Sequence, residues 1–196
     1  MLKNQKGSIM KVLLISLFSI LTFSQELGLG VGTKSPNIEI KNIEGTEIIL
    51  DDSDKKTVLV FYRGSWCPYC MKQLQSIQTE VMPKLDKSSK LVAISVDKKM
   101  IAHKMKKKYQ YTFDIVSDPK ASLLLAFNIV NKLDDKLVQK YKQSYKIDIE
   151  GDSGQTHHMV AHPAVFVIRN GKITYQDIHK EYKDRTKNDD ILAALE

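Results

Sequence analysis

The chain has 196 residues, of which 42% are hydrophobic and 27% are charged. This length suits one domain whose core needs no covalent support, and the presence of only two cysteines excludes a disulfide-rich scaffold. The formal net charge of +7 is a mild excess, because three of the lysines lie in the first 24 residues. By itself it does not indicate nucleic-acid binding.

Residues 1–24 have the pattern of a signal peptide. Three lysines are followed by residues 12–23, which are apolar apart from two serines and a threonine. This stretch is shorter than the about 20 residues of a membrane-spanning helix, and it suits a signal that is cleaved before Gln25. No cysteine follows for lipid attachment. We therefore expect export to the periplasm without stable membrane insertion or a lipid anchor. An uncleaved anchor helix is the alternative, and translation can start at Met1 or at Met10.

The first predicted elements lead to the cysteines. The segment Ile38–Leu50 alternates apolar and polar residues around a Glu-Gly pair, which predicts a β-hairpin. The run Thr57–Tyr62 is continuously apolar and rich in β-branched residues, as in a buried central strand. After the cysteines, helical spacing of apolar residues predicts a helix over Met71–Met82 that ends at Pro83.

A second strand, a helix and a short third strand are predicted next. The apolar run Leu91–Val96 predicts another buried strand, after which we expect Asp97 to cap a helix over Lys98–Tyr109. A short strand is predicted at Phe113–Val116, and a helix is expected to begin at Ser117–Pro119. Most lysines of the basic helix are expected to face solvent, and the few nearby aromatic residues argue against a nucleic-acid platform.

Residues 128–160 predict a helical insertion, with a helix over Asp134–Tyr145 and a polar loop through Gly151–Gly154. The strands Ala164–Ile168 and Lys172–Tyr175 then flank an Asn-Gly pair, which is a strong hairpin signal. A last helix is expected at Asn188–Leu195. Alternating strands and helices imply parallel pairing, and the late hairpin adds antiparallel strands. The expected fold is therefore α/β, with a central mixed β-sheet flanked by helices, an N-terminal β-hairpin and a helical insertion.

Cys67 and Cys70 lie where the first buried strand meets a helix. A helix N-terminus favours the thiolate of Cys67, and Arg63 adds positive charge nearby. Cys70 follows one helical turn later, so that it can attack a mixed disulfide at Cys67. Pro68 suits the first helical turn, and Trp66 is expected to cover the pair. These residues predict thiol redox chemistry without a cofactor.

Other uses of the pair remain open. A Cys-x-x-Cys motif can be half of a zinc site, with further ligands such as His157, His158 and His162, but a second paired motif is missing. A purely structural disulfide would close so small a loop that it adds little stability. Tyr69, inside the motif, can touch substrate or simply pack. We expect no metal.

Two segments resemble a known family. The residues Trp66–Cys70 and His162–Ile173 are similar to the cysteine motif and the cis-proline loop of the thioredoxin fold. The longer string Val60–Cys70 resembles the peroxiredoxin-like branch of the alkyl hydroperoxide reductase and thiol-specific antioxidant superfamily. Ser117–Ala121, the insertion and Asp177–Arg185 fit that branch as well. The resemblance covers residues 34–196, which we expect to form the thioredoxin-like domain.

The resemblance implies separate roles for the site residues. Cys67 would be the attacking cysteine, Cys70 the resolving one, and Pro163, after His162, a cis-proline that faces them. From the residues alone, an ordinary trans proline at a strand start is the alternative. Members of the superfamily reduce hydroperoxides or exchange disulfides, and a thioredoxin-type protein or a small thiol reduces them again.

The chain departs from the peroxiredoxin pattern at two places. Gly64 stands where the pattern has a threonine, and His162 and Pro163 stand where it has an arginine. Those groups hold and polarise the peroxide in the family. The resemblance over the whole domain leads us to expect a peroxiredoxin-like peroxidase, and these two departures favour the alternative, a thiol–disulfide oxidoreductase. A non-catalytic or metal-binding module of the same fold is the third hypothesis.

Overall fold

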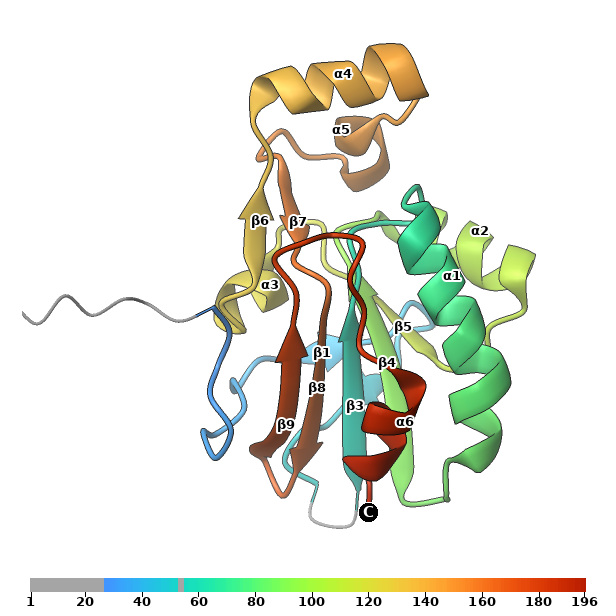
Figure 1. The fold of residues 1–196 in the computed structure, drawn as a ribbon, viewed down its shortest axis with the longest axis vertical. Coiled ribbons are helices and arrows are strands. Elements are labelled where there is room, and N and C mark those ends of the chain that lie inside the picture. Colours follow the sequence, from blue (N-terminus) through green and yellow to red (C-terminus); the bar gives the residue numbers. More distant parts are fainter. Residues whose placement is uncertain (1–26, 53–54) are drawn as a thin grey trace, which may run out of the picture.

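The computed structural model describes residues 27–52 and 55–196. The predicted signal peptide therefore lies outside the described residues. Within the described part of the chain, no helix has the length and apolar character needed to cross a membrane. The centre is a five-stranded sheet (Figure 1). Its strands are, in spatial order, β5 (Asp114–Ser117), β4 (Ser89–Ser95), β3 (Lys56–Phe61), β8 (Ala164–Arg169) and β9 (Lys172–Ile178).

Strand β3 is the central strand, as predicted. It pairs in parallel with β4 and antiparallel with β8, so the sheet is mixed. The register places Phe61 opposite both Ile94 and Ala164. The ends of β3 and β4 and the start of β8 therefore meet at one edge of the sheet, and the cysteine loop begins there.

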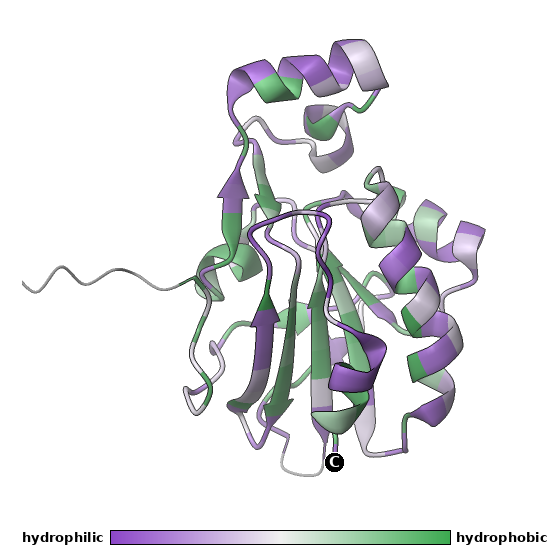
Figure 2. Cartoon of the chain, viewed as in Figure 1, coloured by the Kyte–Doolittle hydropathy of each residue, from purple (hydrophilic) through white to green (hydrophobic). Residues whose placement is uncertain are grey.

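The sheet is covered on both faces. Side chains alternate along β3, so that Val58 and Val60 face one cluster of buried residues while Leu59 and Phe61 face another. Helices α1, α2 and α6 cover the first face, and α3, the insertion and the N-terminal hairpin contribute to the second. Figure 2 shows the central strands as mainly hydrophobic. The elements outside the insertion are α1 (Pro68–Ser76), a π-helical turn (Ile77–Val81), a 3-10 turn (Met82–Lys84), α2 (Lys99–Tyr109), α3 (Ser122–Ala126), α6 (Asn188–Ala193), β1 (Ile40–Lys41) and β2 (Glu47–Ile48).

Both predicted hairpins are present. Strands β1 and β2 pair antiparallel in a separate small sheet. Strands β8 and β9 are joined by Asn170 and Gly171, whose φ angles are 52° and 66°. This left-handed pair is the backbone that an Asn-Gly hairpin turn requires.

Three predicted helix boundaries were wrong. Helix α1 begins at Pro68, and the helical path continues through the π turn to a 3-10 turn that contains Pro83. Asp97 does not cap α2, because Lys98 is the N-cap and makes no side-chain bond there. Helix α3 begins only at Ser122, and Asp118 caps it by accepting hydrogen bonds from three successive backbone N–H groups.

The insertion rises at the edge of the sheet where β3 ends (Figure 1). Its base is an antiparallel pair that the sequence did not predict, β6 (Val130–Lys132) and β7 (Met159–Ala161). The pair carries α4 (Asp135–Tyr145), which matches the prediction, and α5 (Ile149–Ser153), which replaces the predicted polar loop. Helix α5 forms because Asp148 caps its start and Gly154 ends it in a left-handed conformation.

Candidate active site

The two cysteines lie at the N-terminus of α1. Cys67 is its N-cap residue, with extended backbone angles, and Pro68 is the first helical residue. The Cys67 Sγ atom accepts a hydrogen bond from the backbone N–H of Cys70 at 3.3 Å. Both residues are free thiols, and their exposed fractions are 1% and 0%. The predicted placement at the strand-to-helix junction is therefore confirmed.

The pKa values of the two cysteines are shifted in opposite directions. The pKa of Cys67 is lowered to about 6, first by a hydrogen bond from the Cys70 thiol, against the effect of burial. The Cys70 N–H group and the charges of Arg63 and Arg185 lower it further. Burial raises the pKa of Cys70 well above its usual range, and sharing its proton with Cys67 adds to the rise. These opposite pKa shifts favour the thiolate form of Cys67 and the protonated form of Cys70 at neutral pH.

The lowered pKa of Cys67 predicts how the reactivity of its thiol depends on pH. The rate of alkylation of the reduced protein by iodoacetamide should rise with pH and have its midpoint near pH 6, because only the thiolate reacts. The reaction is followed by mass spectrometry of the Cys67 peptide. A midpoint near pH 8.5, the ordinary value for a free thiol, would contradict the assignment.

Arg185 reaches the cysteines from the segment after β9. Its Nη2 atom lies 3.4 Å from the Cys70 Sγ and 3.8 Å from the Cys67 Sγ. Its Nη1 atom donates to the carbonyl oxygens of Tyr182 and Asp184, which hold the guanidinium in place. Arg185 is not among the site residues predicted from the sequence, although the segment Asp177–Arg185 resembles the family. The chain thus has an arginine at the sulfur atoms, supplied by a different element from the one that the family pattern predicts.

Arg63 is enclosed by aromatic rings beside the cysteine loop. It is 3% exposed, and its guanidinium carbon lies 4.9 Å from the ring centres of both Trp66 and Tyr182. Its Nη2 atom donates to the hydroxyl oxygen of Tyr141, which belongs to α4, at 3.1 Å. Trp66 and Tyr141 also pack against each other, with ring centres 5.7 Å apart. The cage therefore joins the cysteine loop, the insertion and the C-terminal segment.

Asp97 supports the cysteine loop from the end of β4. One oxygen of its carboxyl group accepts hydrogen bonds from the Ser65 N–H at 2.8 Å and from the Ser95 hydroxyl at 3.0 Å. The other oxygen is buried without a hydrogen-bond partner in the described part of the chain. Burial raises the pKa of Asp97 to about 7, although the bonds from Ser65 and Ser95 oppose the shift. The tertiary bond to Ser65 explains why the predicted helix cap is not formed.

Because the pKa of Asp97 is raised in the folded protein, we expect the free energy of unfolding to depend on pH. The stability that protonated Asp97 contributes is complete below about pH 4, the ordinary pKa, and is lost as the pH rises through about 7. Relative to Asp97→Asn, the wild type should lose roughly 3 to 4 kcal/mol of unfolding free energy between pH 4 and pH 8. Urea denaturation of both proteins at several pH values measures the difference. Parallel stability curves would show that Asp97 titrates normally.

The remaining predicted site residues lie around this centre. Tyr69 is 41% exposed and packs edge-to-face on Tyr182, with ring centres 5.7 Å apart. His162 is half-buried, and burial lowers its pKa, with the charges of Lys180 and Arg63 adding to the shift. The register pairs Ala164 with Phe61, so Pro163, one residue before β8, lies at the same end of the sheet as the cysteines.

The implied cis-proline is wrong, because every peptide bond among the described residues is trans. Backbone hydrogen bonds hold the chain on both sides of this bond. The His162 N–H donates to the Ile129 oxygen at 2.8 Å, and the Pro163 oxygen accepts from the His179 N–H at 2.9 Å. A trans bond lets the chain pass directly from β7 into β8 while keeping both hydrogen bonds.

Two of the three histidines considered as zinc ligands, His157 and His158, lie in the insertion, and His162 lies in the connection between β7 and β8. His157 bonds to the Pro119 carbonyl at 2.8 Å, and His158 lies between the carboxylates of Asp135 and Glu150, at 3.1 and 2.9 Å. Within residues 27–52 and 55–196, no three His, Cys, Asp or Glu side chains are placed to hold a metal ion. His157 and His158 thus have structural partners at the base of the insertion.

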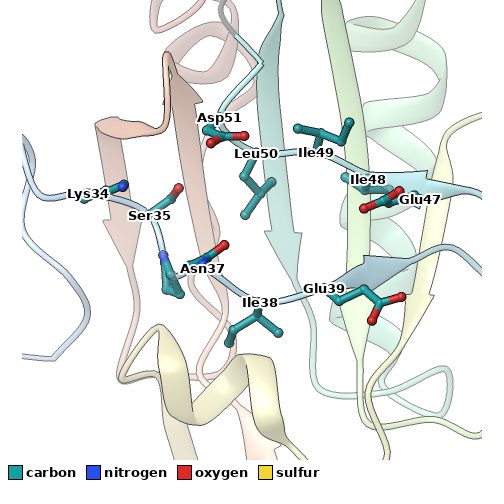
Figure 3. A pocket seen from close by; sticks show the side chains of 11 residues that line it. Lys34, Ser35, Asn37, Ile38, Glu39, Glu47, Ile48, Ile49, Leu50 and Asp51 are labelled. Carbon is teal, nitrogen blue, oxygen red and sulfur yellow. The ribbon is translucent and has the colours of Figure 1, made fainter.

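A separate hollow of about 320 Å³ lies between residues 34–39 and 47–51, around the N-terminal hairpin (Figure 3). Its walls are backbone and mixed polar and aliphatic side chains such as Asn37, Ile38 and Glu47. Neither cysteine lines it. This hollow is therefore separate from the cysteine site.

Solved structures of similar fold are peroxiredoxins. The peroxidoxin BcpB of Mycobacterium tuberculosis superposes with a TM-score of 0.64 at 18% identity, over 87% of this chain and 97% of that one. A PrxQ variant of Xylella fastidiosa gives a TM-score of 0.63 at 16% identity, over 85% and 95% of the two chains. These matches confirm the predicted thioredoxin-like α/β fold.

Sequence comparison also finds relatives that are named thiol-disulfide oxidoreductases. The thiol-disulfide oxidoreductase ResA of Bacillus cereus is 28% identical over 110 residues, which are 55% of this chain and 63% of that protein. The chain thus spans less than two thirds of the length of this relative. Residues 31–176, most of the chain and the whole cysteine region, match the AhpC/TSA family. The chain therefore belongs to the AhpC/TSA family, and the expected peroxiredoxin-like relationship is confirmed.

Proposed function

We propose that the protein is a thiol peroxidase in which Cys67 reduces a hydroperoxide. The Cys67 thiolate attacks the terminal oxygen, the O–O bond breaks, and the departing alkoxide takes a proton and leaves as an alcohol. Cys67 is then a sulfenic acid. The Cys70 sulfur attacks it, forming the Cys67–Cys70 disulfide and releasing water. An external dithiol, of the thioredoxin type or a small molecule, reduces the disulfide and becomes oxidised itself.

The observation that carries this proposal is the arginine at a stabilised thiolate. Arg185 lies within 3.8 Å of both sulfurs, beside a Cys67 whose pKa is about 6. A fixed cation at this place can stabilise the negative charge that develops as the O–O bond breaks. It supplies the function of the arginine that the sequence lacks at His162 and Pro163. Membership of the AhpC/TSA family and the peroxiredoxin fold support the same activity.

A second candidate function is thiol–disulfide exchange on proteins. Cys67 and Cys70 are spaced for an internal disulfide, and the likeness to ResA favours this reaction. However, Cys67 is only 1% exposed. A small hydroperoxide needs a narrower opening than a protein disulfide, so the burial of Cys67 favours the peroxidase.

Two assays on the purified protein decide between these functions. One follows hydrogen peroxide and tert-butyl hydroperoxide consumption with dithiothreitol, and the other follows the reduction of insulin disulfides. If the protein is a peroxidase, we expect it to consume peroxide far faster than dithiothreitol alone does, and to reduce insulin only weakly. Peroxide consumption no faster than that of free thiol, together with insulin reduction, would favour the second function.

We also propose that the protein acts after export. The proposal rests on the sequence pattern of residues 1–24 alone. N-terminal sequencing of the protein from the periplasmic fraction should begin at Gln25. Recovery of the uncleaved chain from the cytoplasm would contradict it.

A further inference from the structure

A groove of about 450 Å³ opens beside the cysteine loop. One wall comes from β6 and α4 of the insertion, and the other from Lys180 and Tyr182 of the segment after β9. Arg63, from the cysteine loop itself, also lines it. Figure 1 shows these three parts of the chain at the same end of the sheet as the start of α1. The volume lies within the range of about 300 to 1,000 Å³ that is usual for small-molecule sites.

The groove is positively charged. Four cations line it, Arg63, Lys132, Lys140 and Lys180. None of them forms a salt bridge with another residue of the described chain. The one lining carboxylate belongs to Asp134, and it already accepts the hydrogen bond that caps α4 at 2.8 Å. An anion in the groove would therefore meet unpaired positive charge on several sides.

Arg63 is the buried member of this set. Although it is only 3% exposed, its guanidinium makes one hydrogen bond, to Tyr141, and its Nε atom is buried without a partner in the described residues. The aromatic rings around Arg63 offset part of the cost of burying this cation, but no carboxylate in the described part of the chain neutralises its charge. An anionic ligand that reaches Arg63 from the groove would remove this cost.

The same groove offers apolar surface. The rings of Tyr141, Tyr145 and Tyr182 and the side chains of Leu133 and Leu137 lie among its lining residues. Aromatic rings beside ammonium and guanidinium groups suit a molecule with an anionic head and an apolar chain. A fully polar anion such as free phosphate would make no use of this apolar surface.

We propose that this groove is a subsite for the anionic head group of an amphiphilic substrate, a hydroperoxide that carries a carboxylate and an apolar chain. The inference rests on the proposed peroxidase function and names its substrate class. Arg63 borders the groove and its charge also lowers the pKa of Cys67. Neither cysteine lines the groove, so the head group would bind beside the cysteine loop and the apolar chain would carry the hydroperoxide to Cys67. The chemistry at Cys67 is the balanced peroxide reduction described above.

Binding is tested without turnover by titrating the reduced protein with decanoate and, separately, with decanol. We expect decanoate to bind at least about tenfold more tightly than the neutral alcohol, and the difference to shrink as ionic strength rises. The variant Lys132→Gln/Lys140→Gln/Lys180→Gln should weaken decanoate binding about tenfold. The matched control Lys99→Gln/Lys104→Gln/Lys107→Gln removes the same charge from α2 and should leave decanoate binding as in the wild type.

Three outcomes would overturn the subsite. They are equal affinity for decanoate and decanol, an equal loss in the α2 control, and binding of an Asp- and Glu-rich peptide without binding of decanoate. Turnover gives the second readout. The ratio of kcat/KM for linoleic acid hydroperoxide to that for its methyl ester should fall about tenfold in the groove variant and not in the control. If no hydroperoxide is turned over, the proposed function fails, while the decanoate titration still decides the subsite.

Discussion

Replacing Cys67 by serine should lower kcat/KM for hydrogen peroxide by at least about a thousandfold. Cys67 supplies the nucleophile, and its thiolate is stabilised by the Cys70 thiol, the Cys70 N–H group and two arginines. A serine hydroxyl stays protonated at neutral pH and cannot reduce a peroxide. The measurement is steady-state peroxide consumption with saturating dithiothreitol.

The matched variant Cys70→Ser separates the two roles. It should still consume one equivalent of peroxide rapidly, because Cys67 remains, and then accumulate the Cys67 sulfenic acid. The initial reaction should need a higher pH than in the wild type, since the hydrogen bond from the Cys70 thiol is the largest cause of the low pKa of Cys67. Full activity of Cys67→Ser with loss of the first equivalent in Cys70→Ser would reverse the assignment.

Replacing Arg185 by methionine should slow the reaction with peroxide by about ten- to a hundredfold at pH 7. The Arg185 Nη2 atom lies 3.4 Å from the Cys70 Sγ, and its charge lowers the pKa of Cys67. Without it, less Cys67 is ionised and the charge that develops on the leaving oxygen is less stabilised. Stopped-flow fluorescence of Trp66 during reaction with peroxide measures the rate across pH 5 to 9.

The pH profile separates these two contributions. A higher midpoint with an unchanged plateau would mean that Arg185 acts only on the Cys67 thiolate, and a lower plateau is expected if it also stabilises the leaving group. Arg185→Lys should restore the midpoint better than the plateau, because an ammonium group keeps the charge and loses the planar fork. Arg169→Met serves as control, since Arg169 lies at the other end of β8 and binds the Leu195 carbonyl. A rate for Arg185→Met equal to that of the control would exclude Arg185 from the chemistry.

The sheet and the cysteine pair could be predicted because their signals are local. An apolar run such as Thr57–Tyr62 indicates a buried strand by itself, and an Asn-Gly pair indicates its turn by its own backbone preference. Cys67 and Cys70 are three residues apart, so their position at a helix start followed from the strand before them and the helix after them.

The missed features depend on contacts between distant residues. Arg185 is 115 positions from Cys70, and no local pattern distinguishes it from a surface arginine. Strands β6 and β7 have three residues each and exist because they pair across the whole insertion. Asp97 satisfied the local rule for a helix cap, but Ser65, 32 residues away, competes for its carboxylate. In each case tertiary structure decides what the sequence leaves open.

The peroxidase assignment is tested most directly by the reaction of the fully reduced protein with one equivalent of hydrogen peroxide. No reductant is present, and the products are identified by intact-mass spectrometry. The wild type should react within seconds and lose two hydrogens as the Cys67–Cys70 disulfide forms, while Cys70→Ser should gain one oxygen at Cys67. A reduced protein whose mass is unchanged after exposure to peroxide, but which forms a mixed disulfide with an oxidised protein partner, would contradict the peroxidase assignment.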